Sequence, residues 1–272
     1  MADKAEQLRA LHHGPPILVL PNAWDAVTAR VFQHAGFPAV ATTSAGVAAA
    51  LGYPDGGAVP PNEMVEAIAR IARAVSVPVT ADIEDAYAQS PDAVADMVLR
   101  VIAAGAVGVN IEDFPAGAAD LANVGLQCDK IAAVVRAASI AGVRVVVNAR
   151  TDGFLRGIGE EAARLPAAIE RGRAYLAAGA DCVFVPGVRD AATIGQLVAG
   201  IGGPINILAV AGTPPVPALE KLGVARVSVG SGPMRASLAV VREVARELKA
   251  SGTYAAFTAS AFPYDEMNEL MR

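Results

Sequence analysis

The chain has 272 residues, of which 54% are hydrophobic and 18% charged, with a formal net charge of −5. This composition supplies one large core, and an acidic chain without a run of Lys or Arg argues against nucleic acid as a partner. No apolar run approaches the roughly 20 residues that span a bilayer, so we expect no membrane partner. Cys128 and Cys182 lack CxxC spacing, which favours a reduced, cytoplasmic setting over disulfides or zinc.

Short runs rich in Val, Ile and Ala alternate along the chain with longer segments of helical period. The runs predict strands at residues 17–20, 39–43, 77–81, 107–111, 143–148, 181–185, 204–208 and 225–229. The segments between them predict helices at 24–36, 61–75, 91–104, 127–140, 159–178, 189–199, 214–221 and 233–250. Eight strand–helix units in about 250 residues favour a (β/α)₈ TIM-type barrel, with a doubly wound open sheet as the alternative.

Two segments depart from this alternation. Residues 113–126 are long for a connection and have little periodicity, which is typical of either a lid or a surface excursion. Residues 253–272 follow the eighth predicted helix and include an amphipathic end. We therefore expect residues 1–252 to form the barrel, and residues 253–272 to form a helical tail that packs on the barrel or on a neighbouring subunit.

Polar motifs stand where four of the predicted strands end. They are Thr-Ser-Ala-Gly (43–46), Ala-Asp-Ile-Glu-Asp (81–85), Val-Asn-Ile-Glu-Asp (109–113) and Val-Asn-Ala-Arg-Thr-Asp (147–152). In parallel α/β proteins, ligands bind at the carboxyl ends of the strands. The sequence therefore predicts a site at this end of the barrel.

Strand side chains alternate with a period of two, so each of three strand ends presents two polar groups on one face. The pairs are Asp82 with Glu84, Asn110 with Glu112, and Asn148 with Arg150. Burying several carboxylates without compensation is costly, and a bound cation would remove that cost. Ligation by oxygen alone suits Mg²⁺ or Mn²⁺. The alternative is a structural Arg–Glu network without a ligand.

Other positions suit an anionic substrate. The fork of Arg150 matches a carboxylate or phosphonate, and the Ser44 hydroxyl with the backbone N–H groups of Ser44, Ala45 and Gly46 can receive an anionic oxygen. Asp55 lies in a turn that can lean over the site, and Asn206 is a further candidate at a strand end. None of the three histidines lies at a strand end, so we predict no catalytic histidine.

The ordered motifs resemble those of the isocitrate lyase/phosphoenolpyruvate mutase superfamily. The resemblance runs from Pro-Asn-Ala-Trp-Asp (21–25) through the strand-end motifs to Ala-Arg-Val-Ser-Val-Gly (225–230). It implies a (β/α)₈ barrel whose last helix is swapped between subunits of a homodimer or homotetramer, and which binds α-keto acids. Members of the superfamily break or make a C–C or P–C bond beside the keto group.

The resemblance also implies roles for single residues. Asp82 would bind Mg²⁺ directly, and Asp55, Glu84 and Glu112 would hold metal-bound waters. Ser44, Ala45 and Gly46 would bind the substrate carboxylate, and Arg150 the anionic end. Arg150, Asp55 and Glu112 are the expected catalytic groups.

The lid departs from the family pattern. Isocitrate and methylisocitrate lyases carry Lys-(Lys/Arg)-Cys-Gly-His after the fourth strand, whereas here residues 114–120 read Phe-Pro-Ala-Gly-Ala-Ala-Asp. Phosphonomutases and phosphonopyruvate hydrolases have a lid with Lys and Asn, and only Asn123 is available here.

Four hypotheses follow. The leading one is a Mg²⁺-dependent lyase that cleaves a C–C bond in a small α-keto or 2-hydroxy dicarboxylate. The second is P–C bond chemistry on phosphonopyruvate or phosphoenolpyruvate. The third is a binding protein for α-ketoglutarate or oxaloacetate with little turnover, and the fourth is a metal-free structural barrel.

Overall fold

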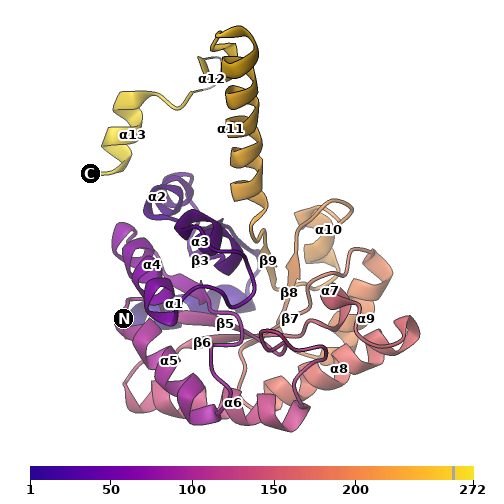
Figure 1. Ribbon diagram of the computed structural model, residues 1–272. Coiled ribbons are helices and arrows are strands. Elements are labelled where there is room, and N and C mark those ends of the chain that lie inside the picture. The colour runs from indigo at the N-terminus through magenta and orange to yellow at the C-terminus, as the bar shows by residue number, and fades with distance from the viewer. Residues whose placement is uncertain (259–260) are drawn as a thin grey trace.

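Nine parallel strands form a nearly closed barrel in the computed structural model, which describes residues 1–258 and 261–272 (Figure 1). The strands are β1 (Leu18–Leu20), β2 (Asn22–Ala23), β3 (Val40–Thr42), β4 (Val79–Asp82), β5 (Gly108–Glu112), β6 (Val146–Arg150), β7 (Cys182–Phe184), β8 (Ile205–Leu208) and β9 (Arg226–Ser228). Their order is β1-β9-β8-β7-β6-β5-β4-β3-β2. The predicted TIM-type barrel is therefore confirmed, and the open sheet is wrong, because the first strand pairs with the last.

The first predicted strand is divided into β1 and β2 by Pro21, which has no N–H to donate to a sheet. β1 pairs with β9 and β2 with β3, so the two pieces of one extended segment complete the ring. The Asn22 side chain holds this seam. Its Oδ1 accepts hydrogen bonds from the N–H groups of Val229 and Gly230, both at 2.9 Å, and its Nδ2 donates to the Thr42 carbonyl at 2.8 Å.

Most of the helices surround the barrel, and the last three project away from it (Figure 1). They are α1 (Ala2–Ala10), the 3₁₀ turn η1 (Leu11–His13), α2 (Ala26–His34), α3 (Ser44–Leu51), α4 (Pro61–Ala74), α5 (Pro91–Ala103), α6 (Val124–Ile140), α7 (Gly153–Arg156), α8 (Glu161–Ala177), α9 (Ala191–Ile201), α10 (Val216–Lys221), α11 (Gly232–Ser251), α12 (Ala255–Thr258) and α13 (Tyr264–Leu270). The eight predicted helices are confirmed, with ends that shift by at most three residues. The sequence did not predict α1, α3 and α7, because these short segments have no clear apolar stripe.

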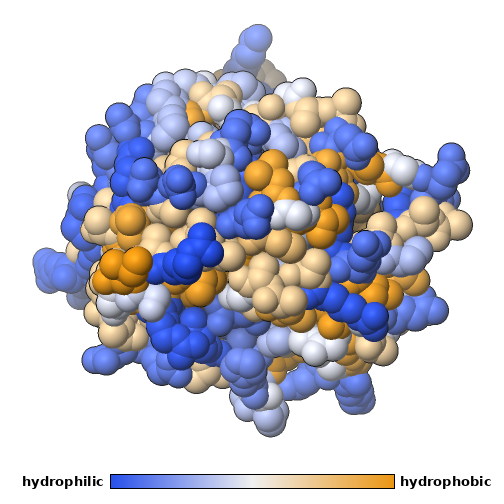
Figure 2. Space-filling model, turned by 90° about the horizontal axis from the view of Figure 1, so that it is seen from below, coloured by the Kyte–Doolittle hydropathy of each residue, from blue (hydrophilic) through white to orange (hydrophobic). Residues whose placement is uncertain are grey.

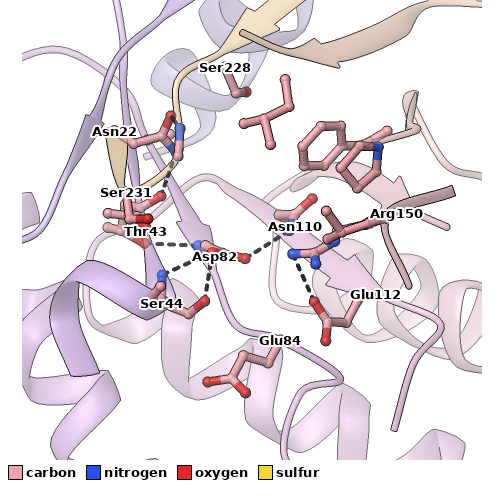
Figure 3. Close-up of a pocket in the computed structure, with 18 of the residues that line it drawn as sticks. Asn22, Thr43, Ser44, Asp82, Glu84, Asn110, Glu112, Arg150, Ser228 and Ser231 are labelled. Atoms are coloured by element: carbon pink, nitrogen blue, oxygen red, sulfur yellow. Dashed lines mark hydrogen bonds and ion pairs between the residues drawn. The ribbon is translucent and has the colours of Figure 1, made fainter. Parts of the chain in front are cut away.

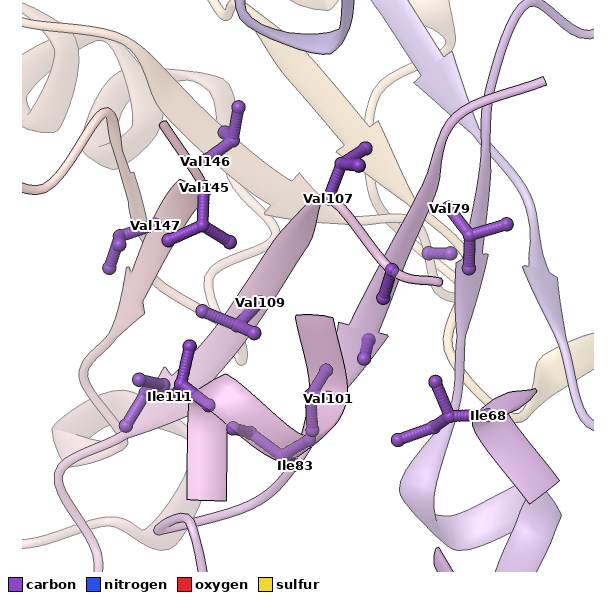
Figure 4. Packing of buried hydrophobic residues seen from close by; sticks show 14 of the residues in the cluster. Ile68, Val79, Ile83, Val101, Val107, Val109, Ile111, Val145, Val146 and Val147 are labelled. Carbon is purple, nitrogen blue, oxygen red and sulfur yellow. The ribbon is translucent and has the colours of Figure 1, made fainter. Parts of the chain in front are cut away.

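The main hydrophobic core lies between the strands and the helices outside them. Figure 4 shows Val79, Val107 and Val109 of the strand segments packed near Ile68 of α4 and Val101 of α5, and all five side chains are buried. Each such side chain contributes about 1.5–3 kcal/mol when it leaves water. Because this core fills the outer faces of the strands, the inner faces are free to carry polar residues.

The C-terminal arm, formed by α11, α12 and α13, projects away from the barrel (Figure 1). It returns only at its end, where Arg30 of α2 donates a hydrogen bond to the Leu270 carbonyl at 3.3 Å. Along the arm, large apolar side chains are exposed: Leu238, Val240, Val241, Leu248, Tyr254, Phe257, Phe262, Tyr264, Met267 and Met271. The predicted domain boundary at residues 252 and 253 falls inside this arm and stays a prediction.

The face of the molecule opposite the arm is a mosaic of hydrophilic and hydrophobic residues (Figure 2). Across residues 1–258 and 261–272, the structure contains no helix of the length and apolar character that a membrane crossing requires. Cys128 and Cys182 are both free thiols, as the sequence predicts.

Candidate active site at the carboxyl end of the barrel

One cavity of about 150 Å³ opens at the carboxyl ends of the strands. Among the residues that line it are seven of the predicted site residues, namely Ser44, Ala45, Asp55, Asp82, Glu84, Glu112 and Arg150. Gly46 and Asn206 are not part of its wall. A side chain at Gly46 would clash, because an added Cβ would lie 2.6 Å from Thr43 and 2.8 Å from Trp24.

Asp82, at the end of β4, is held at the centre of the cavity wall (Figure 3). Its Oδ2 accepts hydrogen bonds from the Ser44 backbone N–H at 2.9 Å and the Ser44 hydroxyl at 2.8 Å, while Oδ1 accepts from Asn110 Nδ2 at 2.7 Å. The Asp82 backbone N–H donates to Thr42 Oγ1 at 2.8 Å. These contacts fix the position of the carboxylate while leaving it without a cationic partner at salt-bridge distance within the described residues.

Glu84 reaches the cavity by a different route from the predicted one. β4 ends at Asp82, and Glu84, Ala86 and Tyr87 all have left-handed backbones, with φ of 52°, 68° and 54°. The alternation argument that paired Asp82 with Glu84 is therefore wrong, although both side chains line the cavity. Tyr87 donates a hydrogen bond to Glu84 Oε1 at 3.0 Å. Burial, with help from the charge of Asp82, raises the pKa of Glu84 to about 7.

Glu112 of β5 and Arg150 of β6 form an ion pair across neighbouring strands. Arg150 Nη1 lies 2.8 Å from Glu112 Oε2, and Arg150 also donates through Nε and Nη2 to both oxygens of Asp152. Burial raises the pKa of Glu112 to about 8 against the opposing effect of Arg150. Burial lowers the pKa of Arg150, but Glu112 and Asp152 outweigh it, so the pKa lies above its ordinary value. Arg150 therefore faces inward, and its charge is shared between two carboxylates.

Asn148 is fully buried, and its Nδ2 donates to Asn110 Oδ1 at 2.9 Å. Asn110 lines the cavity, whereas Asn148 does not. The prediction that six polar groups converge at the mouth is therefore wrong for Asn148, because its side chain is turned to Asn110. The two asparagines form a chain of hydrogen bonds that ends on Asp82.

A second, buried network supports Arg150 from behind, and the sequence analysis did not identify it. Asp113 Oδ1 accepts from the Asp152 N–H at 3.0 Å, and Asp113 Oδ2 accepts from Tyr175 at 2.7 Å and from Arg171 at 3.0 Å. Burial raises the pKa of Asp113 in spite of these bonds. One sequence signal pointed to this network: Asp113 and Asp152 are each the last residue of a strand-end motif.

The predicted lid segment, residues 113–126, is a loop between β5 and α6 only over residues 113–123, because α6 already begins at Val124. None of its residues lines the cavity. Phe114 packs against Arg156, whose Cζ lies 4.6 Å from the ring centroid, and Arg156 does line the cavity. Asn123 accepts hydrogen bonds from the N–H groups of Gly125 and Leu126 as the cap of α6.

The wall formed by β7, β8 and β9 contains residues that the site prediction missed. Phe184, Leu208, Arg226 and Ser228 line the cavity there. Arg226 and Ser228 lie in the segment 225–230 that contributed to the family resemblance, but the resemblance implied no role for them, so strand alternation was the remaining signal.

The donor set suits a divalent cation bound partly through water. Four carboxylates line one cavity, those of Asp55, Asp82, Glu84 and Glu112. Burial raises the pKa of Glu84 and of Glu112, and a nearby cation would favour their charged forms. Within the described ranges, no three carboxylate, His or Cys ligands are close enough to hold one ion directly. Mg²⁺ keeps several waters and takes one or two carboxylates, so the arrangement fits this ion.

Comparison with known proteins identifies the family of the chain. A family model described as phosphoenolpyruvate phosphomutase matches residues 8–249. The chain is 37% identical to an uncharacterized protein of Mycobacterium tuberculosis over 94% of this chain and 96% of that protein. It is 31% identical to an oxaloacetate decarboxylase of Rhodopseudomonas palustris over 78% of this chain and 72% of the relative.

Solved structures agree. A lyase or mutase of Burkholderia cenocepacia J2315 superposes with a TM-score of 0.91 at 37% identity, covering 98% of this chain and 95% of the other. A phosphonopyruvate hydrolase in complex with oxalate and Mg²⁺ gives a TM-score of 0.85 at 26% identity, covering 98% and 94%. The chain therefore belongs to the phosphoenolpyruvate phosphomutase family, within the isocitrate lyase/phosphoenolpyruvate mutase superfamily.

Proposed function

We propose that the protein is a Mg²⁺-dependent lyase that cleaves a C–C bond in a small α-keto or 2-hydroxy dicarboxylate. The observation that carries this proposal is the position of Asp82. Its carboxylate is fixed by Ser44 and Asn110 and shares a cavity with Glu84, Glu112 and Arg150. Such a combination of oxygen ligands and a guanidinium suits a substrate that has both a chelating end and an anionic end.

The ion would be held by Asp82, with Asp55, Glu84 and Glu112 binding its waters. When bound, it supplies polarisation of the substrate's keto oxygen and so favours an enolate-like leaving group.

The protein's own residues orient the substrate and move protons. Arg150 is held by Glu112 and Asp152, so its guanidinium is already in place to contact the anionic end. At the N-terminus of α3, the Ser44 N–H is taken by Asp82 and the Gly46 N–H by Thr43 Oγ1. Ala45 is therefore the residue of this segment whose N–H would bind a substrate carboxylate. Asp55 at the mouth and Glu112 inside the cavity are the carboxyl groups available to carry a proton. Asn206 supports the wall from below, since its Oδ1 accepts from Ser228 at 3.1 Å.

The loop of residues 113–123 favours a second candidate, a keto-acid binding protein with little turnover. This loop contains no Lys, Cys or His, so it offers no proton donor of the kind found in the isocitrate lyases. The phosphonopyruvate hydrolase similarity keeps P–C bond chemistry as a third candidate, although the loop also lacks the expected lysine.

The test is proton and phosphorus NMR of the protein with Mg²⁺ and a panel of acids: oxaloacetate, α-ketoglutarate, isocitrate, methylisocitrate, dimethylmalate and phosphonopyruvate. We expect one acid to give a product, with turnover abolished by EDTA and at least about 100-fold slower in Asp82→Asn. The exposed helical variant Asp96→Asn is the matched control and should keep full activity.

Each other result has a distinct meaning. Line broadening of one keto acid without a product would replace the lyase by the binding protein. A new phosphorus signal would select P–C chemistry. If metal removal and Asp82→Asn both leave turnover unchanged, the proposed site is wrong.

The arm supports a proposal about assembly. We infer that α11 and the tail pack on a second copy of the chain, as a homodimer or a homotetramer, because their exposed apolar side chains have no cover within the described part of one subunit. A reduced, cytoplasmic setting stays our expectation and is supported by the two free thiols.

A further inference from the structure

Arg226 is a second arginine in the wall of the cavity, on the side opposite the strand-end motifs. Along β9 the side chains alternate. Val227 packs in the outer apolar cluster, whereas Arg226 and Ser228 line the cavity. Arg226 is only 2% exposed. Its guanidinium is therefore enclosed in the barrel and reaches the space that the substrate would occupy.

The surroundings of Arg226 differ from those of Arg150. Among the residues that the structure describes, its one hydrogen bond runs from Nε to Ser228 Oγ at 3.3 Å, and its buried Nη1 has no hydrogen-bond partner. Within residues 1–258 and 261–272, Arg226 forms no salt bridge, while Arg150 forms two. Burial lowers the pKa of Arg226 to about 10, still high enough for the group to be charged at neutral pH.

A buried charge without a partner is expensive, and removing one partner of a buried pair is strongly destabilising. The neighbouring residue in register on β8, Asn206, shows the same imbalance. Its Oδ1 accepts from Ser228, while its buried Nδ2 has no partner. Arg226 Nη1 and Asn206 Nδ2 are thus two buried donors on neighbouring strands without a partner in the described part of the chain. Buried His12, whose Nε2 also has no partner there, is close enough for the charge of Arg226 to lower its pKa. An anionic oxygen in the cavity would supply the acceptor that Arg226 lacks.

We propose that Arg226 joins Arg150 in binding the carboxylate at the anionic end of the substrate, and so selects dicarboxylates over monocarboxylates of the same length. Ser228, which follows Arg226 towards the carboxyl end of β9, and Asn206, which pairs with Arg226 in register, act as positioning residues. This inference rests on the proposed function, because that function supplies the first carboxylate and the metal. The planar fork of arginine matches a carboxylate in bidentate fashion, and a cavity of about 150 Å³ suits an acid of a few carbon atoms.

The experiment compares two acids that differ only in the distal group. Malate and 2-hydroxybutyrate have the same number of carbons, but malate ends in a carboxylate and 2-hydroxybutyrate in a methyl. Calorimetric titration with Mg²⁺ present should show that wild type prefers malate, and that Arg226→Met reduces this preference roughly 10- to 100-fold. Arg226→Lys should retain part of it. Oxalate, which has no distal group, should bind wild type and Arg226→Met alike.

Controls separate this inference from the proposed function. Arg9→Met removes a partly buried guanidinium that pairs with Asp181 at 2.8 Å, away from the cavity, and should leave the malate preference intact. If oxalate binding to wild type does not need Mg²⁺, the proposed function fails, but the ratio of the two acids still decides the role of Arg226. A folded Arg226→Met with an unchanged ratio overturns the inference. If that variant does not fold, Ser228→Ala should lower the same ratio, and no change there overturns it.

Discussion

The barrel and the C-terminal arm bury their side chains in opposite ways. In the barrel, apolar residues such as Val109 are fully buried on the outer face of the sheet, under the helices. Polar residues such as Asn110 are hydrogen-bonded on its inner face. In the arm, Val241 is 60% exposed and Tyr264 is 74% exposed. The barrel therefore covers its apolar side chains within one chain, whereas the arm leaves large apolar side chains uncovered within the described residues. The candidate site belongs to the first region, and the proposed assembly to the second.

The largest expected effect concerns the arm. Leu238 and Val241 lie one turn apart on α11 and are 51% and 60% exposed. Light scattering after size exclusion should show wild type as a dimer or larger, and the double variant Leu238→Glu, Val241→Glu as a monomer. Arg242→Ala, on the same helix and also exposed, should keep the assembly. A monomeric wild type would contradict this expectation, because the apolar side chains of the arm would then stay exposed to water without a second copy to cover them.

The next effect tests the buried support of Arg150. Asp152 is fully buried and holds two nitrogens of Arg150. Asp152→Asn should reduce kcat/KM by at least about 10-fold and lower the free energy of unfolding by about 3 kcal/mol, because it removes one partner of a buried ion pair. Urea denaturation and steady-state kinetics measure the two effects.

Asp129→Asn is the matched control, since Asp129 is exposed on α6. If Asp152→Asn retains wild-type stability and activity, Glu112 alone is enough to position Arg150. The buried network behind Arg150 would then not be needed for the site.

The smallest effect concerns pH and the base of the barrel. His12 is 2% exposed, and its Nδ1 lies 2.8 Å from the Leu8 carbonyl. Burial, with the nearby charge of Arg226, lowers its pKa from 6.5 to about 3. The folded state therefore keeps His12 neutral, so its contribution to stability is present above pH 6.5 and is lost as the pH falls from 6.5 towards 3.

At pH 5 this loss should be about 2 kcal/mol relative to pH 7.5. Urea denaturation of wild type and His12→Gln at both pH values measures it as a difference, which cancels the titration of other groups. An equal pH dependence in the two proteins would show that His12 is protonated within the fold.

Strand periodicity and motif order were enough to predict the barrel and the acidic side of the cavity wall, at the ends of β4, β5 and β6. Asp82, Glu112 and Arg150 lie on regular strands, where the alternation of side chains holds. The alternation failed at Glu84, because a non-glycine left-handed backbone after β4 cannot be inferred from side-chain type. Asn148 shows that a residue on the inner face of a strand can be turned to a neighbouring side chain and stay out of the cavity.

Arg226 was missed for a different reason. A single arginine in a strand resembles a solvent-facing residue until the register of β8 and β9 places it inside.

The seam at Asn22 has a consequence for the order in which a newly made chain can build this site. Asn22 is synthesised early, but its acceptors are satisfied only by the N–H groups of Val229 and Gly230, over two hundred residues later. A nascent chain that has emerged only as far as β8 still has an open ring, with its acidic inner surface facing water. Contacts this distant in sequence carry a large loop-closure entropy. We therefore expect the cavity to be complete only once β9 has paired with β8 and β1.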